Sequence, residues 1–439
     1  MEYTINEVLQ FVEENDVKFV KLAFCDILGN QKNVSIMASE LPRAFQSGIS
    51  FDASAVKGFM NVEESDLFLF PDASTVSILP WRPQQGRVIR IFCDIKKPDG
   101  TPFEGDGRNI LKQAIQRAET MGYQCKIGPE CEFYLFELND KGYPTKEPHD
   151  RAGYFDIAPF DRGENVRREI CLTLEEMGIQ PESSHHEQGP GQNEIDFKYS
   201  DALQAADNLI TFKSVVKSVA AQNGLFASFM PKPFEDKSGN GLHINLSLSK
   251  NGVNIFRNNE NNHSKEAESF IQGVLDRIVE ITAFLNPLTN SYRRLGLDEA
   301  PKYVTWSHQN RSQLIRIPAA QGEYVRMELR SADGACNPYI AFALIIHAGL
   351  EGMEAQKTLE PATNYNLYEV DPSKIEGIKQ LPSTLKEALE YAKKSDFVKQ
   401  VLAPITLKKY LAIKEEEYNQ VISAKDQLQA EEEAYFTRV

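Results

Sequence analysis

Polar and apolar residues alternate at every second position in several stretches of the chain. The polar positions are Glu130 and Glu132, then Glu194 and Asp196, then His243, Asn245 and Ser247, and finally Arg326, Glu328 and Arg330. Because successive side chains of a β-strand point to opposite faces, each set would line one surface of a sheet. A solvated outer face alternates in the same way. Faces built mainly from Glu, His and Arg nevertheless favour a shared functional site.

Length and charge restrict the class of protein. With 439 residues, of which 41% are hydrophobic and 25% charged, the chain can bury a large core and is expected to hold two or more domains. The net charge of -15 argues against a general nucleic-acid-binding surface. The longest apolar run, 339–346, is too short to span a bilayer and predicts a buried helix that Asn337 and Pro338 open.

The six cysteines have no CxxC spacing, and the N-terminus has no basic and apolar leader. A reducing cytoplasm is therefore the expected location, with no membrane association.

Turn residues divide the chain into two parts. An amphipathic helix over 5–12 and strands over 17–27 and 33–36 predict a small α+β domain, to which strands over 75–79 and 88–95 are added. The Pro- and Gly-rich segment 97–107 marks the boundary, so we predict domains at 1–100 and 101–439. Helices are predicted over 108–121, 164–177 and 201–222, alternating with the polar-faced strands.

The candidate acidic residues form a mostly oxygen ligand set. They are Glu130, Glu132, Glu187, Glu194 and Glu328, together with His243. Hard divalent cations, Mg²⁺ or Mn²⁺, suit such ligands. Five carboxylates in one place would repel one another and take up protons unless cations compensated them, and two divalent ions would nearly balance the charge. No zinc signature is present, and His185 is interpreted as a hydrogen-bonded core residue.

The second candidate set is cationic. It consists of Arg294, Arg311, Arg316, Arg326 and Arg330. Arginine binds carboxylate and phosphate groups in bidentate fashion, although each of these residues could equally form a surface ion pair. Metal ligands and arginines together favour phosphoryl transfer, with neither a P-loop nor a protein-kinase motif to bind the nucleotide. The Gly239 and Gly241 loop is a weak candidate cradle, since such a loop is also an ordinary turn.

At this point the residues match a known family. The motifs are GPECEFYLF (128–136), SHHEQGPGQNEIDF (184–197), MPKPF (230–234), GNGLH (239–243), NSYRRL (290–295), NRSQLIRIP (310–318) and VRMELRSADGACNPY (325–339). With these motifs in order over nearly its whole length, the chain resembles type I glutamine synthetases of the shorter bacterial and archaeal form. The resemblance implies an α+β fold with a β-grasp-like N-terminal domain and a catalytic domain built on a curved antiparallel sheet. It also implies two stacked six-membered rings, with each site between neighbouring subunits.

The resemblance also assigns roles to individual residues. One metal would lie on Glu132, Glu187 and Glu194, and the other on Glu130, His243 and Glu328. L-glutamate would be held by Gly239, Arg294, Arg311 and Arg330, with Glu299 on a closing flap, and ATP by Glu182, Ser247, Arg316 and Arg326. The γ-carboxylate would attack ATP to give γ-glutamyl phosphate, which ammonia opens to glutamine. Asp52 of an adjacent subunit would help deprotonate ammonium, with Glu299 and Arg311 as the other catalytic residues.

Two departures from the family lie around the expected ammonium site. The chain reads DASA at 52–55 where the family usually has DGSS, and its flap RLGLDEAP at 294–301 is one residue shorter than the usual RLVPGYEAP. A γ-glutamylamide synthetase that uses an organic amine is therefore an alternative. A non-catalytic ring-forming regulatory homologue is a second. Asn61 replaces an arginine linked to feedback in the short branch, and Tyr368 resembles the adenylylated tyrosine of the longer branch without requiring that role.

Overall fold

The N-terminal part of the computed structural model, which describes residues 3–82, 85–257 and 263–439, is a mixed sheet with two helices. Its elements are α1 (Ile5–Glu14), β1 (Val17–Cys25), β2 (Gln31–Met37), α2 (Leu41–Ser47), β3 (Ile49–Asp52), β4 (Asp66–Pro71), β5 (Ser77–Ile78) and β6 (Arg87–Lys96). The strand order is β2-β1-β6-β4-β3, with β5 paired to β6. Since β1 runs parallel to β6 and antiparallel to β2, this is the predicted β-grasp-like arrangement.

The strand predicted over 75–79 is much shorter in the structure. Residues Ala73–Thr75 form a 3-10 turn, and only Ser77–Ile78 pair with β6. The cause lies one residue upstream, because the Asp72 carboxylate accepts a hydrogen bond from the Ser74 N–H at 3.1 Å and closes the turn.

The three helices of the larger part that were predicted over 108–121, 164–177 and 201–222 are confirmed to within one residue at each end, and further helices follow them. The helices are α3 (Gly107–Thr120), α4 (Glu164–Glu176), α5 (Ala202–Gln222), α6 (Lys265–Leu285), α7 (Pro338–Glu354), α8 (Leu385–Lys394), α9 (Asp396–Val401), α10 (Pro404–Ile422) and α11 (Gln427–Tyr435). The Asn337 side chain accepts a hydrogen bond from the Tyr339 N–H and caps α7, as predicted. Among the described residues, no helix is both long and apolar enough to cross a membrane.

A large, almost entirely antiparallel sheet organises this part of the chain. Its strands are β7 (Tyr123–Leu138), β8 (Pro144–Pro148), β9 (Pro181–His186), β10 (Gln192–Phe197), β11 (Ser200–Asp201), β12 (Leu225–Ser228), β13 (Leu242–Lys250), β14 (Val253–Asn254), β15 (Trp306–His308), β16 (Ile315–Ile317) and β17 (Met327–Leu329). The main path is β15-β16-β17-β13-β7-β10-β9. The central strand β7 is 16 residues long and also pairs with β8, β11 and β12.

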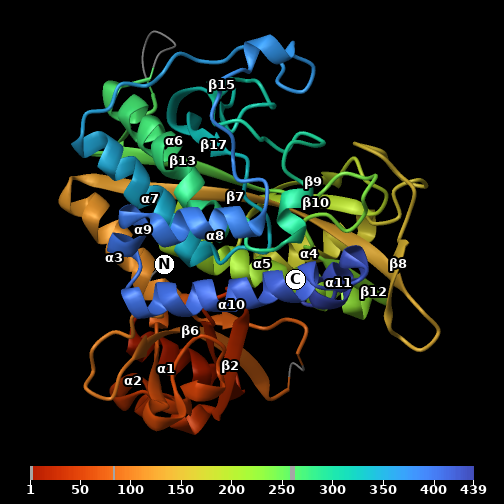
Figure 1. Ribbon diagram of the computed structural model, residues 1–439. Helices are drawn as coiled ribbons and strands as arrows, with labels where there is room; N and C mark the ends of the chain where they lie inside the picture. Colours follow the sequence, from red (N-terminus) through yellow and green to blue (C-terminus); the bar gives the residue numbers. More distant parts are fainter. Residues whose placement is uncertain (1–2, 83–84, 258–262) are drawn as a thin grey trace.

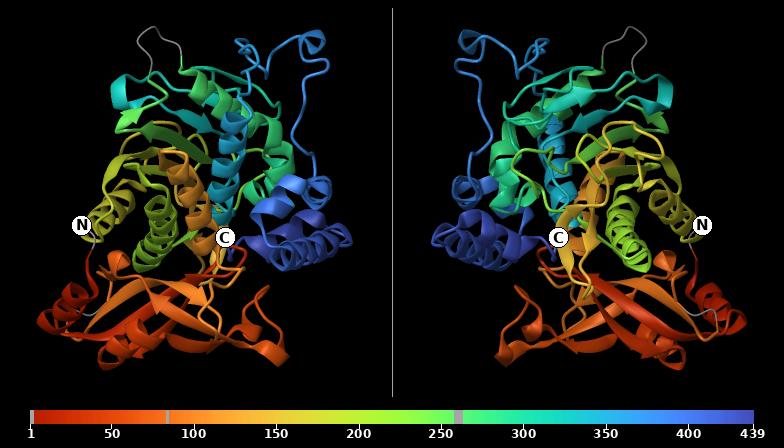
Figure 2. Two further views of the ribbon diagram at one scale, coloured as in Figure 1. Left: turned by 90° about the vertical axis from the view of Figure 1, so that its left-hand side faces the viewer. Right: turned by 90° about the vertical axis from the view of Figure 1, so that its right-hand side faces the viewer.

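The two faces of this sheet differ in chemistry. Helices α3 and α5 pack against β7, where Ile127, Cys131 and Phe133 are buried in the hydrophobic core. Glu130 and Glu132 alternate with these apolar residues and therefore lie on the opposite face. Figure 1 places the N-terminal sheet below the larger part, and the side views agree (Figure 2). The sheet thus leaves one polar face free for a site.

A buried arginine joins the two parts of the chain. Arg108, at the start of α3, is 3% exposed and donates to both oxygens of Asp207 on α5, at 3.1 and 2.9 Å. Its other contacts reach the N-terminal sheet, with Asp94 at 2.7 Å and Asp72 at 3.0 Å. Tyr339 donates to Asp207 at 2.6 Å. The domain boundary at residue 100 remains a prediction. The Arg108 cluster links the N-terminal sheet to the helices of the larger part.

Replacing Arg108 tests that coupling. Arg108→Met is expected to lower the free energy of unfolding by about 3–5 kcal/mol, because it leaves Asp207 buried without its cation. Urea unfolding followed by circular dichroism measures the change. The exposed pair Arg151–Glu147 provides the control, since Arg151→Ala should lower the free energy by less than about 1 kcal/mol. Equal effects of the two substitutions would contradict a special role for Arg108.

Candidate functional site

Strand register gathers the polar residues into rows across the sheet. Glu130 of β7 lies directly opposite Asp196 of β10 on one side and His243 of β13 on the other. Glu132 lies opposite Glu194, which in turn lies opposite His185 of β9. Because side chains directly opposite each other have closely spaced Cβ atoms, acidic residues from β7 and β10 meet histidines from β9 and β13 on one face.

One predicted metal triad is assembled in the structure. Glu130, His243 and Glu328 each offer a ligand atom, and these atoms lie within 4.8 Å of one another. His243 Nδ1 is 3.3 Å from Glu130 Oε2 and 3.5 Å from Glu328 Oε1. Glu328 is 1% exposed, so its charge is removed from water and must be compensated by neighbouring groups.

The other predicted triad is assembled only in part. Glu187 and Glu194 do lie together, but the third residue within 4.8 Å is His185. Glu132 lies opposite Glu194 with its Oε2 accepting from the Gly241 N–H at 2.6 Å. Glu132 therefore borders the pair and belongs to none of the close groups found among the described residues. Glu130, Glu194 and Asp196 form a further close group.

Burial and mutual repulsion control the charge of this cluster. Burial, followed by the charges of Glu132 and Glu299, raises the pKa of Glu187 to about 8. Burial, with the charges of Asp196 and Glu132, also raises the pKa of Glu194 well above its usual range. Burial opposes ionisation of Glu130 too, but its contact with His243 holds its pKa at about 2. The site has more carboxylate charge than its own side chains can neutralise.

His185 and Asp196 were not among the predicted site residues. His185 is half-buried and stands edge-on to Phe155, with ring centroids 4.8 Å apart, and its Nε2 is 3.9 Å from Glu194 Oε1. It is therefore beside the carboxylates rather than in an apolar core. Asp196 alternates with Glu194, and His185 is two residues before Glu187. This two-residue spacing could have identified both residues as members of the polar sheet face.

The arginines form a second layer around the carboxylates. Arg316 and Arg330 both donate to Glu328, one to each oxygen, with the Arg330 bond at 2.5 Å. Arg326 donates through Nε to Asn245 at 2.7 Å, and Asn245 donates to Glu130 at 2.8 Å. Three predicted arginines are thus linked to the metal-site residues directly or through one amide.

Arg294 and Arg311 are placed differently. Arg294 is buried and donates to the carbonyls of Ser331 and Ala332 at 2.5 and 2.6 Å. It packs beside Gly239, where a Cβ would lie 2.7 Å from Arg294 Cγ. Arg311 is exposed, and only its carbonyl contacts the cluster, accepting from Arg330 Nε at 3.1 Å.

Glu299 is held near the cluster by the loop that carries it. Its carboxylate is 3.7 Å from Arg330 Nη2 and accepts from Gln188 Nε2 at 3.4 Å. Asp52 behaves differently. It is exposed at the end of β3 in the N-terminal sheet, where its carboxylate accepts from the N–H and hydroxyl of Ser54. No contact between Asp52 and the clustered residues occurs within the described part of this single chain.

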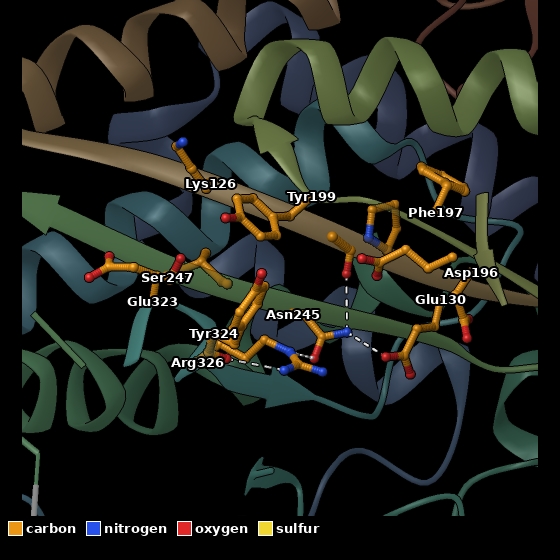
Figure 3. A pocket seen from close by; sticks show the side chains of 14 residues that line it. Lys126, Glu130, Asp196, Phe197, Tyr199, Asn245, Ser247, Glu323, Tyr324 and Arg326 are labelled. Atoms are coloured by element: carbon orange, nitrogen blue, oxygen red, sulfur yellow. Dashed lines mark hydrogen bonds between the residues drawn. The ribbon is translucent and has the colours of Figure 1, made fainter. Parts of the chain in front are cut away.

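A pocket opens beside Glu130 on the same sheet face (Figure 3). It is lined by Lys126, Glu130, Glu182, Asp196, Phe197, Tyr199, Asn245, Ser247, Glu323, Tyr324 and Arg326, among others. Lys126 Nζ lies 5.5 Å from the centroid of the Tyr199 ring. Three predicted ATP residues, Glu182, Ser247 and Arg326, therefore share one pocket, whereas Arg316 lies outside its lining.

Two family models match the chain. One, described as "Glutamine synthetase, beta-Grasp domain", matches residues 16–98, and the other, "Glutamine synthetase, catalytic domain", matches residues 104–433. Curated glutamine synthetases from Clostridium saccharobutylicum and Methanosarcina mazei are 48% and 49% identical over 422 residues. Each match covers 95% of this chain, with 95% and 94% of the two relatives.

Solved structures are similar over the same length. A GmaS/ADP complex superposes with a TM-score of 0.88 at 31% identity and covers 98% of both chains. A cryo-EM structure of Plasmodium falciparum glutamine synthetase gives a TM-score of 0.84 at 27% identity, over 95% of this chain and 96% of that one. The matches reach both the N-terminal sheet and the polar sheet face with its carboxylates. The chain belongs to the glutamine synthetase family.

Proposed function

We propose that the polar face of the large sheet is where this chain carries out its reaction. As a glutamine synthetase, the chain forms glutamine from glutamate and ammonia with consumption of ATP. The observation that carries the assignment is the close group of Glu130, His243 and Glu328 next to a pocket that three predicted ATP residues line. Neither an organic-amine ligase nor a non-catalytic homologue is favoured by the relatives, which are named glutamine synthetases.

The carboxylates fit two hard divalent cations, Mg²⁺ or Mn²⁺. Glu130, His243 and Glu328 would hold one, and Glu187 and Glu194, with Glu132 beside them, would hold the other. The fit rests on the donor set, which is mostly oxygen, and on the carboxylate charge that the protein leaves uncompensated. When bound, such cations neutralise the charge on a phosphoryl group during its transfer.

ATP would occupy the pocket in Figure 3. The Tyr199 ring offers apolar surface for a base, and Lys126 and Arg326 supply positive charge. Glu182 and Ser247 add hydrogen-bonding groups at the same walls. Glu130 lines this pocket and is also a member of the metal triad. The phosphate end of the nucleotide would therefore face the carboxylates.

Glutamate would bind on the other side of the carboxylates. Arg294, Arg311 and Arg330 offer guanidinium groups for its two carboxylates. Gly239 would present its backbone, and a side chain there is excluded, since a Cβ would lie 2.5 Å from the Pro231 carbonyl. Of this set, Arg330 is already oriented by its bond to Glu328.

The reaction then proceeds in two steps. A γ-carboxylate oxygen of glutamate attacks the γ-phosphorus of ATP, ADP leaves, and γ-glutamyl phosphate forms. Arg316 and Arg326 stabilise the charge that moves during this step. Ammonia then attacks the carbonyl carbon of the γ-glutamyl phosphate, and the bond from that carbon to the phosphate oxygen breaks. Asp52 would take a proton from ammonium and Glu299 would cover the intermediate, while the exposed Arg311 closes on the substrate.

The assembly would be a homo-oligomer of two stacked hexameric rings. Asp52 supports shared sites, because it is exposed and makes no contact with the cluster of its own chain. A neighbouring subunit would have to present it. The cysteines, all six unpaired, suit a reducing cytoplasmic compartment.

Product formation with different amines tests the reaction. The purified protein with glutamate, ATP and Mg²⁺ should form one glutamine for each phosphate released when ammonium is supplied. Methylamine, ethanolamine and polyamines should each give less than about a tenth of the kcat/KM for ammonium, since a site built for ammonia excludes larger groups. An organic amine that reacts while millimolar ammonium does not would contradict the function.

Glu328 tests the location of the site. Glu328→Gln should lower kcat/KM about 100-fold or more, because it removes a metal ligand and the partner of two arginines. Glu351 on α7 pairs with Arg277 in a similar bidentate manner, away from the sheet face. Glu351→Gln is therefore the control and should keep activity within about twofold of the parent protein. Parent-like turnover in Glu328→Gln would place the chemistry elsewhere.

Glu194 tests the charge balance without any activity assay. Glu194→Gln should raise the apparent Tm of metal-free protein by about 2 °C, because it relieves repulsion among buried carboxylates. The same substitution should abolish most of the further rise that Mg²⁺ or Mn²⁺ produces in the parent protein. Thermal denaturation with and without cation measures both effects. The exposed Glu376→Gln should leave both unchanged, and a metal response retained in Glu194→Gln would count against the site.

A further inference from the structure

The flap loop that carries Glu299 has an unusual backbone. Gly296, Asp298 and Glu299 all have positive φ angles, of 87°, 46° and 66°. Glycine adopts this left-handed conformation readily, but Asp298 and Glu299 do so only against their steric preference. The loop is closed by hydrogen bonds of its own, with the Gly296 N–H donating to the Ala300 carbonyl at 3.0 Å. Something outside the loop must stabilise this conformation.

Lys232 supplies that contact from beneath the loop. Its ammonium group donates to Asp298 Oδ2 at 2.7 Å and to the Lys237 carbonyl at 2.5 Å. The lysine is 4% exposed, and its own backbone is fixed on both sides by Asn290. Among the described residues, Asp298 is the one carboxylate within 4.0 Å of this ammonium. A buried cation with a single anionic partner favours the loop position that keeps the pair together.

The position that the pair favours is also the one that places Glu299. With Asp298 held, the next carboxylate lies 3.7 Å from Arg330 Nη2 and 3.4 Å from Gln188 Nε2. The two neighbouring acidic residues therefore have different contacts. Asp298 pairs with the buried Lys232, and Glu299 lies beside Arg330 at the proposed reaction site.

We infer that the Lys232–Asp298 ion pair is a latch that holds the short flap, and with it Glu299, over the acyl-phosphate intermediate. Both residues are positioning residues, since neither contacts the proposed substrates. The inference rests on the proposed location of the reaction site. It also explains how a flap without the usual Pro-Gly turn can stay closed, because an ion pair to a rigid buried group replaces the stiffness of that turn.

A loosened latch has a defined chemical consequence. In the productive step, the ammonia nitrogen forms a bond to the carbonyl carbon of the γ-glutamyl phosphate, phosphate leaves with the electrons of the carbon–oxygen bond, and the extra proton passes to a carboxylate or to solvent. If water enters first, its oxygen attacks the same carbon and returns glutamate, phosphate and a proton. Glutamine is then not formed although ATP has been consumed. Closure that excludes water prevents this loss.

The decisive measurement is the ratio of phosphate released to glutamine formed. In Asp298→Asn the ratio should rise from about one to about two or more, with the KM for ammonium about fivefold higher and the rate of phosphate release within about twofold. Asp298→Glu keeps the charge and should restore much of the coupling. Asp236→Asn is the matched control, because Asp236 forms an exposed pair with Lys237 nearby and should keep a ratio of one.

Lys232→Met provides a second test from the other side of the pair. Combined with Asp298→Asn, it should change the ratio no more than either single substitution, because both remove the same interaction. A ratio of one and an unchanged KM in Asp298→Asn would overturn the latch. This failure is distinct from failure of the proposed site, which is indicated by full turnover in Glu328→Gln.

Discussion

Like charges that face one another across neighbouring strands dominate this structure. The register of β7 and β10 places acidic residues in adjacent rows, with His243 of β13 beside them, and the core on the other face of the sheet prevents a one-residue shift that would separate them. The arrangement is stable only with positive charge around it. Arg316 and Arg330 on Glu328 supply part of that charge, His243 lies between two carboxylates, and the remainder is left for cations.

The same balance explains why the surroundings are built from buried, hydrogen-bonded groups. Arg294 is held by the carbonyls of Ser331 and Ala332, and Arg330 by the Arg311 carbonyl and by Glu328, so the protein itself orients both guanidinium groups. Glu132 accepts from a backbone N–H of the Gly239–Gly241 loop, which ties that loop to the sheet. Buried charge is also balanced by opposite charge at Arg108, whose guanidinium group contacts three aspartates. Preorganisation of this kind is typical of sites that stabilise moving charge.

Local patterns predicted the strands and helices well, because those patterns depend on neighbouring residues. The alternation around Cys131 and Ile195 and the Asn337–Pro338 helix start are examples. Contacts between distant segments were not predictable in this way. The pairing of Glu130 with both Asp196 and His243 depends on register between strands far apart in the chain. Likewise, no local signal indicated that two arginines would share Glu328, or that Lys232 would reach Asp298. The neighbours of His185 were missed for the same reason.

The length of β7 has a consequence for the substrates. Lys126 and Glu130 line the pocket proposed for the nucleotide, and Glu130 and Glu132 belong to the carboxylate rows, so a single strand runs beneath both. At about 3.3 Å per residue, the six steps from Lys126 to Glu132 span about 20 Å of nearly inextensible backbone. The strand thus fixes the distance between the residues that would bind the base and the carboxylates where the phosphoryl group would be transferred. Variation in the loops can alter which amine is accepted. A phosphoryl donor longer or shorter than ATP would place its terminal phosphate away from the carboxylates.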